Sequence, residues 1–512
     1  MSNLISFGHI VPELLLGGIA VVLFLFSAFA RGKAFWQSVL FPTLAGSGLL
    51  IALGLVLYFG LGDGGSGTDC TYGGCKLFFG LLATDPMAMF FRILVIAATF
   101  ICVIISIGSP ALPEDRKGEY HGLLMVMAMG MCFLAASNNL MMIYVAMETV
   151  SLCSYLLTGW DSRSQRSREA GMKYVLYGGV ASGVMLFGMS LFYGLFGDLS
   201  LQGLHLALSG NGVLDSVGGQ WAALISIVFI LGGLGYKVAA VPFHMWCPDA
   251  YQGAPTPFTA LLSVGPKAAG MALLLRFFYG MFLVPGSMDN VIGASSQIPW
   301  VLIIGIISAI TMTIGNLTAI VQNNLKRLLA YSSIAHAGYV LMAVAAGGRD
   351  GFEAVTIYMA IYLIMNMGAF AVVAAVSRST GSDDLRVFRG LSNRAPLLAL
   401  AMAVFMISLT GLPPTAGFIG KLYLFAALIH RGDFWFIALA VVGIANSAVS
   451  LYYYARVLKT MYFEKAEEGM PPVKLGNAPT AVAIALAIPT LLLGIFWQPL
   501  AIVARWSATM FH

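Results

Sequence analysis

The residues best able to do chemistry in this sequence are four ionisable side chains inside long apolar stretches. They are Glu148, Lys237, Lys267 and Lys421. A charge at the centre of a membrane helix costs about 2.5–3.5 kcal/mol on insertion scales, so such groups are expected to be paired, hydrated or neutral. Ionisable groups at that depth are also typical of ion and proton pathways. We therefore interpret these four residues as parts of a proton path.

Two further residues are candidates for the same path. Lys173 follows Glu169 by four residues on one helical face, so an interfacial ion pair is as good an interpretation as a path role. His336, in YSSIAHAGY, is either a hydrogen-bonded core residue or a relay that accepts and donates a proton near pH 7. Arg92 and Arg276 lie near predicted helix ends, where long basic side chains extend to water, so we leave both out of the path.

The composition requires a membrane protein. Hydrophobic residues make up 59% of the 512 residues and charged residues only 10%, against about 25% charged in an average soluble protein. Apolar stretches recur along the whole sequence and leave no room for a soluble domain. The formal net charge of +5 does not indicate nucleic-acid binding, because membrane proteins concentrate lysine and arginine in cytoplasmic loops.

A helix needs about 20 apolar residues to cross a bilayer, and the sequence predicts an all-α polytopic protein with about fourteen such helices. The predicted segments are 10–30, 37–60, 84–107, 119–136, 138–158, 169–196, 218–242, 254–282, 299–321, 326–346, 352–378, 394–428, 435–462 and 480–505. Loops after the odd-numbered segments hold most of the basic residues, among them Arg163, Arg166 and Lys326. This asymmetry predicts that these loops are cytoplasmic and that both termini lie on the outer side.

Two predicted helices, the seventh and the twelfth, are interrupted by glycine and proline beside a lysine. Lys237 lies in GGLGYKVAAVPFHMW and Lys421 in GLPPTAGFIGK. A broken helix frees backbone groups that protein or water must satisfy, so at membrane depth it marks a polar cavity. The two lysines are 421 − 237 = 184 residues apart, which is the spacing expected of a five-helix unit repeated once. Because each unit has an odd number of helices, the second copy is inverted, as in many transporters.

This repeat divides the chain into four parts. They are an N-terminal three-helix segment at 1–110, a first five-helix repeat at 119–282, a second at 299–462 and a C-terminal helix at 480–512. The second helix of the unit carries Glu148 in the first copy and His336 in the second. Lys267, in SVGPKAAG, follows Lys237 by about one segment. We expect the Lys237 amine to keep its proton when Glu148 moves close, and to release it toward Lys267 when Glu148 moves away.

The sequence shows no pattern typical of a cofactor site. Its six cysteines form no CxxC pair and have no histidine at ligand spacing, which argues against a metal or iron–sulfur site. GGVASG, residues 178–183, lies inside an apolar helix with no preceding strand, so it indicates close helix packing rather than nucleotide binding. Cys70 and Cys75 share a predicted outer loop, where a disulfide and two free thiols are equally compatible with the sequence.

Five motifs together resemble the antiporter-like membrane subunits of respiratory complex I. They are AMETVSLCSYLL, PFHMWCPDAYQGAPTP, GPKAAG, KRLLAYSSIAHAGY and GLPPTAGFIGKLYLF. The resemblance covers nearly the whole chain and is strongest to the subunit N family of NADH-quinone oxidoreductase, which includes mitochondrial NADH dehydrogenase chain 2.

The resemblance implies a fourteen-helix fold with inverted repeats and proton translocation driven by quinone reduction in partner subunits. It implies that Glu148 and Lys237 form the coupling pair, that Lys267 is the central relay, and that Lys421 lies nearer the outer exit. No cofactor is expected in this chain, whereas NADH, FMN, iron–sulfur clusters and quinone are expected in partner subunits. The expected partners are subunit M, the small subunits K and J, and the lipid of a bacterial inner membrane, with no nucleic acid.

Two other functions share parts of this pattern. A multisubunit sodium/proton antiporter has the same ancestry and would use the same buried lysines, but it would move sodium without an electron donor. A structural subunit of the membrane arm would use its buried charges only to hold helices in register. In that case an assembled Lys237→Met variant would still pump protons.

Overall fold

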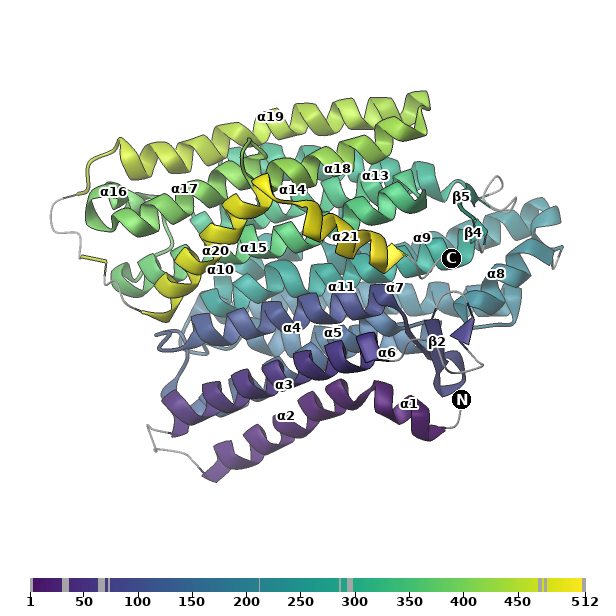
Figure 1. Ribbon diagram of the computed structural model, residues 1–512, viewed down its shortest axis with the longest axis horizontal. Coiled ribbons are helices and arrows are strands. Elements are labelled where there is room, and N and C mark those ends of the chain that lie inside the picture. The colour runs from purple at the N-terminus through teal and green to yellow at the C-terminus, as the bar shows by residue number, and fades with distance from the viewer. Residues whose placement is uncertain are drawn as a thin grey trace.

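Helices lying side by side form almost all of the protein (Figure 1). The computed structural model describes residues 3–29, 36–62, 70–71, 74–210, 212–284, 287–291, 298–467, 472–473 and 477–508. The helices are α1 (Asn3–His9), α2 (Val11–Phe29), α3 (Phe41–Gly62), α4 (Pro86–Ser106), α5 (Lys117–Ala136), α6 (Leu140–Thr158), α7 (Gln165–Phe196), α8 (Leu201–Gly210), α9 (Val217–Val238), α10 (Trp246–Gly253), α11 (Thr256–Phe282), α13 (Trp300–Ile320), α14 (Leu325–Ala346), α15 (Gly348–Thr380), α16 (Leu391–Arg394), α17 (Pro396–Thr410), α18 (Ala416–Arg431), α19 (Phe434–Tyr462), α20 (Ala478–Ile495) and α21 (Gln498–Ser507).

The strands are short and lie in connections between helices. They are β1 (Cys70–Thr71), β2 (Gly74–Leu77), β3 (Leu82–Thr84), β4 (Leu283–Val284) and β5 (Ser287–Val291). The first three form an antiparallel sheet in the order β1-β2-β3, in which the backbones of Cys70 and Cys75 are paired. The side chains of these two cysteines lie outside the described residues, so their disulfide stays a prediction.

The predicted all-α, membrane-spanning fold is confirmed. In the described ranges, thirteen helices are long and apolar enough to cross a membrane. The predicted segment 394–428 is instead two shorter helices, α17 and α18. We also predict one helix over 480–505, whereas the structure has α20 followed by α21. Pro499 explains this second interruption, because its ring clashes with the carbonyl four residues earlier, at the end of α20.

Both predicted helix breaks are present, and hydrogen bonds of the backbone close them. After α9, Ala239 adopts a left-handed conformation with φ 61°, and the Ala240 N–H donates to Gly235 O at 2.8 Å. After α17, Gly411 has φ 87°, and its N–H donates to Ile407 O at 3.1 Å. These bonds satisfy carbonyl groups that a helix end would leave unpaired. The inverted relation of the two repeats stays a prediction.

The interior of the bundle is built from α11, α14 and α15. The central stretch of α11 is wholly buried, and those of α14 and α15 are 94% and 89% buried. Figure 1 shows α2 along one edge of the bundle and α19 along the opposite edge, with α11 and α15 between them. The same view places α16 at one end of the bundle, and β2 and α8 toward the other. Polar side chains on the three inner helices are therefore shielded from lipid by the outer helices.

Arg92 and Arg276 do not extend to water, so our interpretation of these two residues is wrong. Arg92 Nε lies 2.9 Å from Glu13 Oε1, at ion-pair distance but without hydrogen-bond geometry. Arg276 donates two hydrogen bonds to Asp85, at 2.6 Å and 3.0 Å. All four side chains are buried. Glu13 and Asp85 lie at the beginnings of the first and third predicted segments, and each meets an arginine inside the bundle.

Replacing Arg276 by methionine will destabilise the protein, because buried Asp85 then loses its counter-charge. Removing one partner of a buried ion pair costs about 3–5 kcal/mol. We expect a clearly lower melting temperature for the detergent-solubilised variant. The matched control is Arg163→Met, which removes a pair with Asp161 in which the arginine is 64% exposed, and exposed pairs contribute about 0–1 kcal/mol. Equal melting temperatures for the two variants would show that the buried pair does not stabilise the fold.

Candidate functional site

Lys237 is positioned by the first helix break, in the last turn of α9. Its side chain is buried, and Nζ donates a hydrogen bond to Ser151 Oγ on α6 at 3.1 Å. Its stem packs against α11, where a Cβ atom on Gly270 would lie 3.5 Å from Lys237 Cγ. Gly270 is three residues after Lys267, about one turn along α11, so Lys237 contacts the face of α11 that carries Lys267.

Glu148 lies one helical turn from the serine that binds Lys237. Positions 148 and 151 are three residues apart on α6 and therefore face the same way. Glu148 is half-buried, and its Oε1 is buried without a hydrogen-bond partner among the described residues. Lys237 therefore contacts Ser151 and, within the described structure, forms no ion pair with Glu148. The predicted coupling pair occupies one region of the bundle with its two charges apart.

Lys267 is joined to α14 through Ser333. Its Nζ donates to Ser333 O at 3.0 Å and also to Ser333 Oγ. The hydroxyl of Tyr362 donates to the same Oγ at 2.7 Å, and the hydroxyl of Tyr251 lies 3.3 Å from it. A cavity of about 10 Å³ touches Lys267, Ser333 and His336. That volume is near the lower limit for one water molecule.

His336 lies at the centre of a cluster of tyrosines. Its Nδ1 lies 2.5 Å from the Tyr358 hydroxyl and its Nε2 lies 3.1 Å from the Tyr454 hydroxyl. The Tyr454 hydroxyl is in turn hydrogen-bonded to Ser332. Both ring nitrogens are therefore engaged. A neutral imidazole can make these two contacts because it has one donor and one acceptor nitrogen. The same contacts fix the ring in the core and give it a route to accept a proton on one side and release one on the other.

Lys421 is bound to the second helix break. Its Nζ donates to the carbonyl of Thr410, the last residue of α17, at 2.7 Å and to Ser447 Oγ at 2.8 Å. The ammonium group also lies 4.8 Å from the centre of the Tyr339 ring, which is itself 5.7 Å from the His336 ring. Lys421 follows its break, whereas Lys237 precedes its own, so the two lysines do not hold equivalent places at the two breaks.

Lys173 lies outside this buried group. Its side chain is 41% exposed and forms ion pairs with Glu169 at 2.6 Å and Asp249 at 2.9 Å. Arg327 binds the other oxygen of Asp249 at 2.6 Å. The interfacial pair with Glu169 is therefore present. The cluster joins α7, α10 and α14 at the rim of the bundle.

The tyrosines of the site are missed by the sequence analysis, and our prediction for Lys326 is wrong. We expect Lys326 in a cytoplasmic loop, but the structure buries it in the first turn of α14. Lys326 and Ser333 are seven residues apart and lie on one helical face, a spacing in KRLLAYSSIAHAGY that could have revealed the error. For Tyr358, Tyr362 and Tyr454, the sequence holds no comparable signal, because 20 tyrosines are scattered along the chain.

Substituting Gly270 will test how closely α9 packs on α11. A Cβ atom at Gly270 would lie 2.8 Å from Val238 Cγ1, and overpacking of this kind typically costs about 1–3 kcal/mol. We expect Gly270→Ala to lower the melting temperature. Gly179→Ala on α7 is the matched control, because open space surrounds that position and alanine favours a helix by roughly 0.8–1.0 kcal/mol over glycine. A Gly270→Ala variant as stable as Gly179→Ala would contradict this packing.

Comparison with known proteins places this arrangement in a family. The family model described as "NADH:quinone oxidoreductase/Mrp antiporter, TM" matches residues 137–446. NADH-quinone oxidoreductase subunit N of Anaeromyxobacter sp. is 48% identical over 84% of this chain and 84% of its own length.

Solved structures agree with this match. A chain of respiratory complex I from Thermus thermophilus is 31% identical, with a TM-score of 0.75 over 96% of this chain and 98% of that chain. A chain of the Mrp complex from Dietzia sp. has a TM-score of 0.80 over 97% of each chain at 21% identity, which shows a shared fold. The chain belongs to the subunit N family of NADH-quinone oxidoreductase, the antiporter-like membrane subunits of respiratory complex I.

Proposed function

We propose that this chain conducts protons across the membrane through Glu148, Lys237, Lys267, His336 and Lys421, driven by quinone reduction in partner subunits. The observation that carries the proposal is the run of polar contacts from Lys267 through Ser333, His336 and its tyrosines toward Lys421. Most of this run lies on α11, α14 and α15, the most buried helices of the bundle, and its last members lie on α18 and α19. Buried polar side chains at membrane depth are costly, and a continuous series of them is typical of an ion pathway.

The three path lysines have neutral hydrogen-bond partners. Lys237 binds a serine hydroxyl, Lys267 a hydroxyl and a carbonyl, and Lys421 a carbonyl and a hydroxyl. Within the described structure none of the three has a carboxylate at ion-pair distance. A proton can therefore leave each amine without breaking a salt bridge. The buried arginines Arg92 and Arg276, by contrast, are held by carboxylates.

Coupling in this proposal begins at Glu148. Its Oε1 lacks a hydrogen-bond partner among the described residues, so the carboxylate has a free position and can approach Lys237 or turn away. Approach stabilises the ammonium form of Lys237, and withdrawal lets the proton pass toward Lys267. The stem of Lys237 packs at Gly270, about one turn from Lys267 on α11, so this transfer follows one short stretch of that helix.

Electron transfer in this proposal takes place elsewhere. The relatives are subunits of NADH-quinone oxidoreductase, and we propose that NADH, FMN, iron–sulfur clusters and quinone bind to partner subunits. The redox reaction then reaches this chain as a conformational or electrostatic change at Glu148. A sodium/proton antiporter is the second candidate, because the matching family model covers both kinds of protein.

The variants Glu148→Gln, Lys237→Met and Lys421→Met will test the path directly. We expect each to lower quinone-reduction-driven proton uptake in vesicles by at least about tenfold, since a positioned proton-transfer group contributes roughly 10²–10⁴-fold to a rate. Lys173→Met is the matched control and should pump normally, because that lysine is at the rim.

Assembly of each variant must be verified alongside the rate of quinone reduction. Normal pumping in all three assembled path variants would overturn the proposal and leave a structural role. Sodium movement without an electron donor would instead favour the antiporter.

We further propose that the exposed face of α6 contacts a neighbouring membrane subunit, with subunits M, K and J as the candidates. This face consists of Met141, Val145, Leu152 and Leu156, each about half exposed, and Glu148 lies at its edge. A partner here would cover Glu148 and could supply the charge that moves it. Both termini are proposed to lie on the outer side of a bacterial inner membrane, as the basic loops indicate.

A photo-cross-linking amino acid at Val145 tests this contact in the intact complex. We expect it to form an adduct with another membrane subunit, because its side chain is 49% exposed in the isolated chain. Adducts with lipid only would show that α6 faces the bilayer.

A further inference from the structure

A polar cavity of about 410 Å³ opens at the end of the bundle that carries the predicted cytoplasmic loops. Its wall combines the α4–α5, α6–α7 and α15–α16 connections with the corner between α10 and α11, and includes Ser109, Arg166, Thr256, Lys326, Ser377 and Asp383. This volume holds many water molecules. No residue of the proposed proton path lines it.

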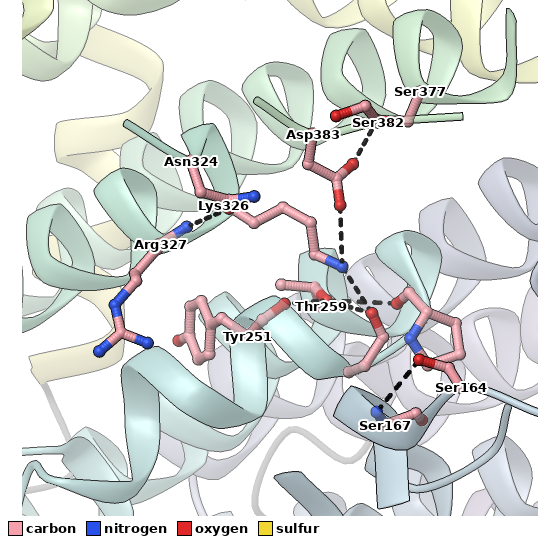
Figure 2. Close-up of polar contacts among 12 residues, drawn as sticks. Ser164, Ser167, Tyr251, Thr259, Asn324, Lys326, Arg327, Ser377, Ser382 and Asp383 are labelled. Carbon is pink, nitrogen blue, oxygen red and sulfur yellow. Dashed lines mark hydrogen bonds and ion pairs between the residues drawn. The ribbon is translucent and has the colours of Figure 1, made fainter. Parts of the chain in front are cut away.

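Lys326 and Asp383 fix one wall of this cavity (Figure 2). Lys326 Nζ donates to Ala254 O at 2.6 Å and lies 3.7 Å from Asp383 Oδ2. The other carboxylate oxygen of Asp383 accepts a hydrogen bond from Ser377. The backbone N–H of Leu325 donates to Asp383 O at 2.9 Å, which ties the beginning of α14 to the loop after α15. The wall is therefore held together by these contacts, and the Asp383 carboxylate, 22% exposed, lies at its surface.

A seam between α11 and α15 leads from the cavity toward Lys267; its α11 side is polar, and its α15 side has Ala374 and Phe370 between Ser377 and Asn366. On α11, positions 256, 259, 263 and 267 recur every three or four residues and share one face. On α15, positions 377, 374, 370, 366 and 362 do the same. Thr256 and Ser377 line the cavity, and Asn366 Nδ2 donates to Ser263 Oγ at 2.6 Å. At the far end of the seam, Lys267 and Tyr362 both bind Ser333.

Asn366 has an unused hydrogen-bond acceptor at the middle of this seam. Its side chain is wholly buried, and its Oδ1 accepts no hydrogen bond from the described residues. A buried amide oxygen without a partner costs about 1–3 kcal/mol, and ordered water commonly fills such a position. From Thr256 to Lys267 the helix rises about 16 Å at 1.5 Å per residue. Asn366 lies between Thr256 and Lys267 in height, because it contacts Ser263.

We propose that this cavity is where protons are taken up from the cytoplasmic side, and that the seam between α11 and α15 carries them over water at Asn366 and Ser263 to Lys267. The proposal rests on the proposed function and places proton uptake at the junction of the two predicted repeats. Phe370, whose ring lies 6.2 Å from that of Tyr251, is one helical turn from Asn366 on the cavity side of α15. In this proposal the Phe370 side chain must move for water to connect the cavity with Asn366.

Asn366→Leu and Ser263→Ala test the seam in the assembled complex. We expect each to lower proton uptake per electron by at least severalfold, with the double variant no worse than the single ones, because both act on one route. Ser226→Ala is the matched control: Ser226 is buried on α9, and its hydroxyl bonds only to its own helix at Ala222 O, 2.7 Å away. Normal pumping in both assembled seam variants would overturn the proposal.

Lys267→Met, measured in parallel, distinguishes failure of the uptake route from failure of the proposed function. If Lys267→Met stops pumping while both seam variants pump normally, the uptake route is wrong and the proposed function stands. If Lys267→Met also pumps normally, the proposed function itself fails.

Cysteine labelling tests the cavity without altering the seam. Ser109→Cys on the cavity wall should react with a charged methanethiosulfonate reagent applied to the cytoplasmic face of sealed vesicles, and this modification should lower pumping severalfold. Ser162→Cys, exposed nearby but outside the cavity lining, should react from the same face with pumping unchanged. The unsubstituted protein, whose Cys102, Cys132, Cys153 and Cys247 are buried, gives the background. Reaction of Ser109→Cys only from the opposite face, or without effect on pumping, would contradict the proposal.

Discussion

A cation buried among apolar helices needs an oxygen partner, and in this protein that partner is repeatedly the carbonyl at the end of a helix. Lys421 binds the last carbonyl of α17, Arg276 a carbonyl in the last turn of α5, and Lys326 the carbonyl just after α10. Helix ends leave carbonyl groups unpaired and carry a partial negative charge. Each of these three cations therefore depends on a helix that ends inside the bundle, and the break beside Lys421 supplies a partner for that lysine.

The partners of the buried charges separate structural residues from candidate path residues. Arg92 and Arg276 are held by Glu13 and Asp85, and such pairs lock helices together because neither charge can leave alone. Lys237, Lys267 and Lys421 have hydroxyl and carbonyl partners, which accept the proton-bearing form without adding a charge of their own. Tyrosine side chains and His336 lie between Lys267 and Lys421.

The sequence predicts the membrane-spanning helices well because hydropathy is a strong signal in a membrane protein. The helix breaks are predictable because prolines follow Lys237, at Pro242, and precede Lys421, at Pro413 and Pro414, and proline interrupts a helix. The sequence predicts tertiary partners poorly. Asp85 and Glu13 lie at helix beginnings, where acids are common. Only the packing of α4 against α11 makes Asp85 the partner of Arg276, and only the tertiary fold brings Glu13 of α2 to Arg92 of α4.

The contacts around His336 show the same limit. Tyr358 and Tyr454 are 22 and 118 residues from His336 in sequence, and no local pattern links them to it. The helical spacing of Lys326 and Ser333, by contrast, is visible in the sequence. It conflicts with the general expectation that a basic residue beside a loop is solvated, and in this protein that expectation is wrong. Only the structure therefore shows whether a basic residue at the beginning of a helix is buried or solvated.

If protons cross the bundle along the proposed route, His336 lies at its middle. The proton-to-electron ratio of an assembled His336→Phe variant in vesicles, measured together with its rate of quinone reduction, tests this role. Phenylalanine keeps a planar ring and removes both ring nitrogens, so we expect a clearly lower ratio. An unchanged ratio, with quinone reduction and assembly intact, would show that protons do not pass through His336.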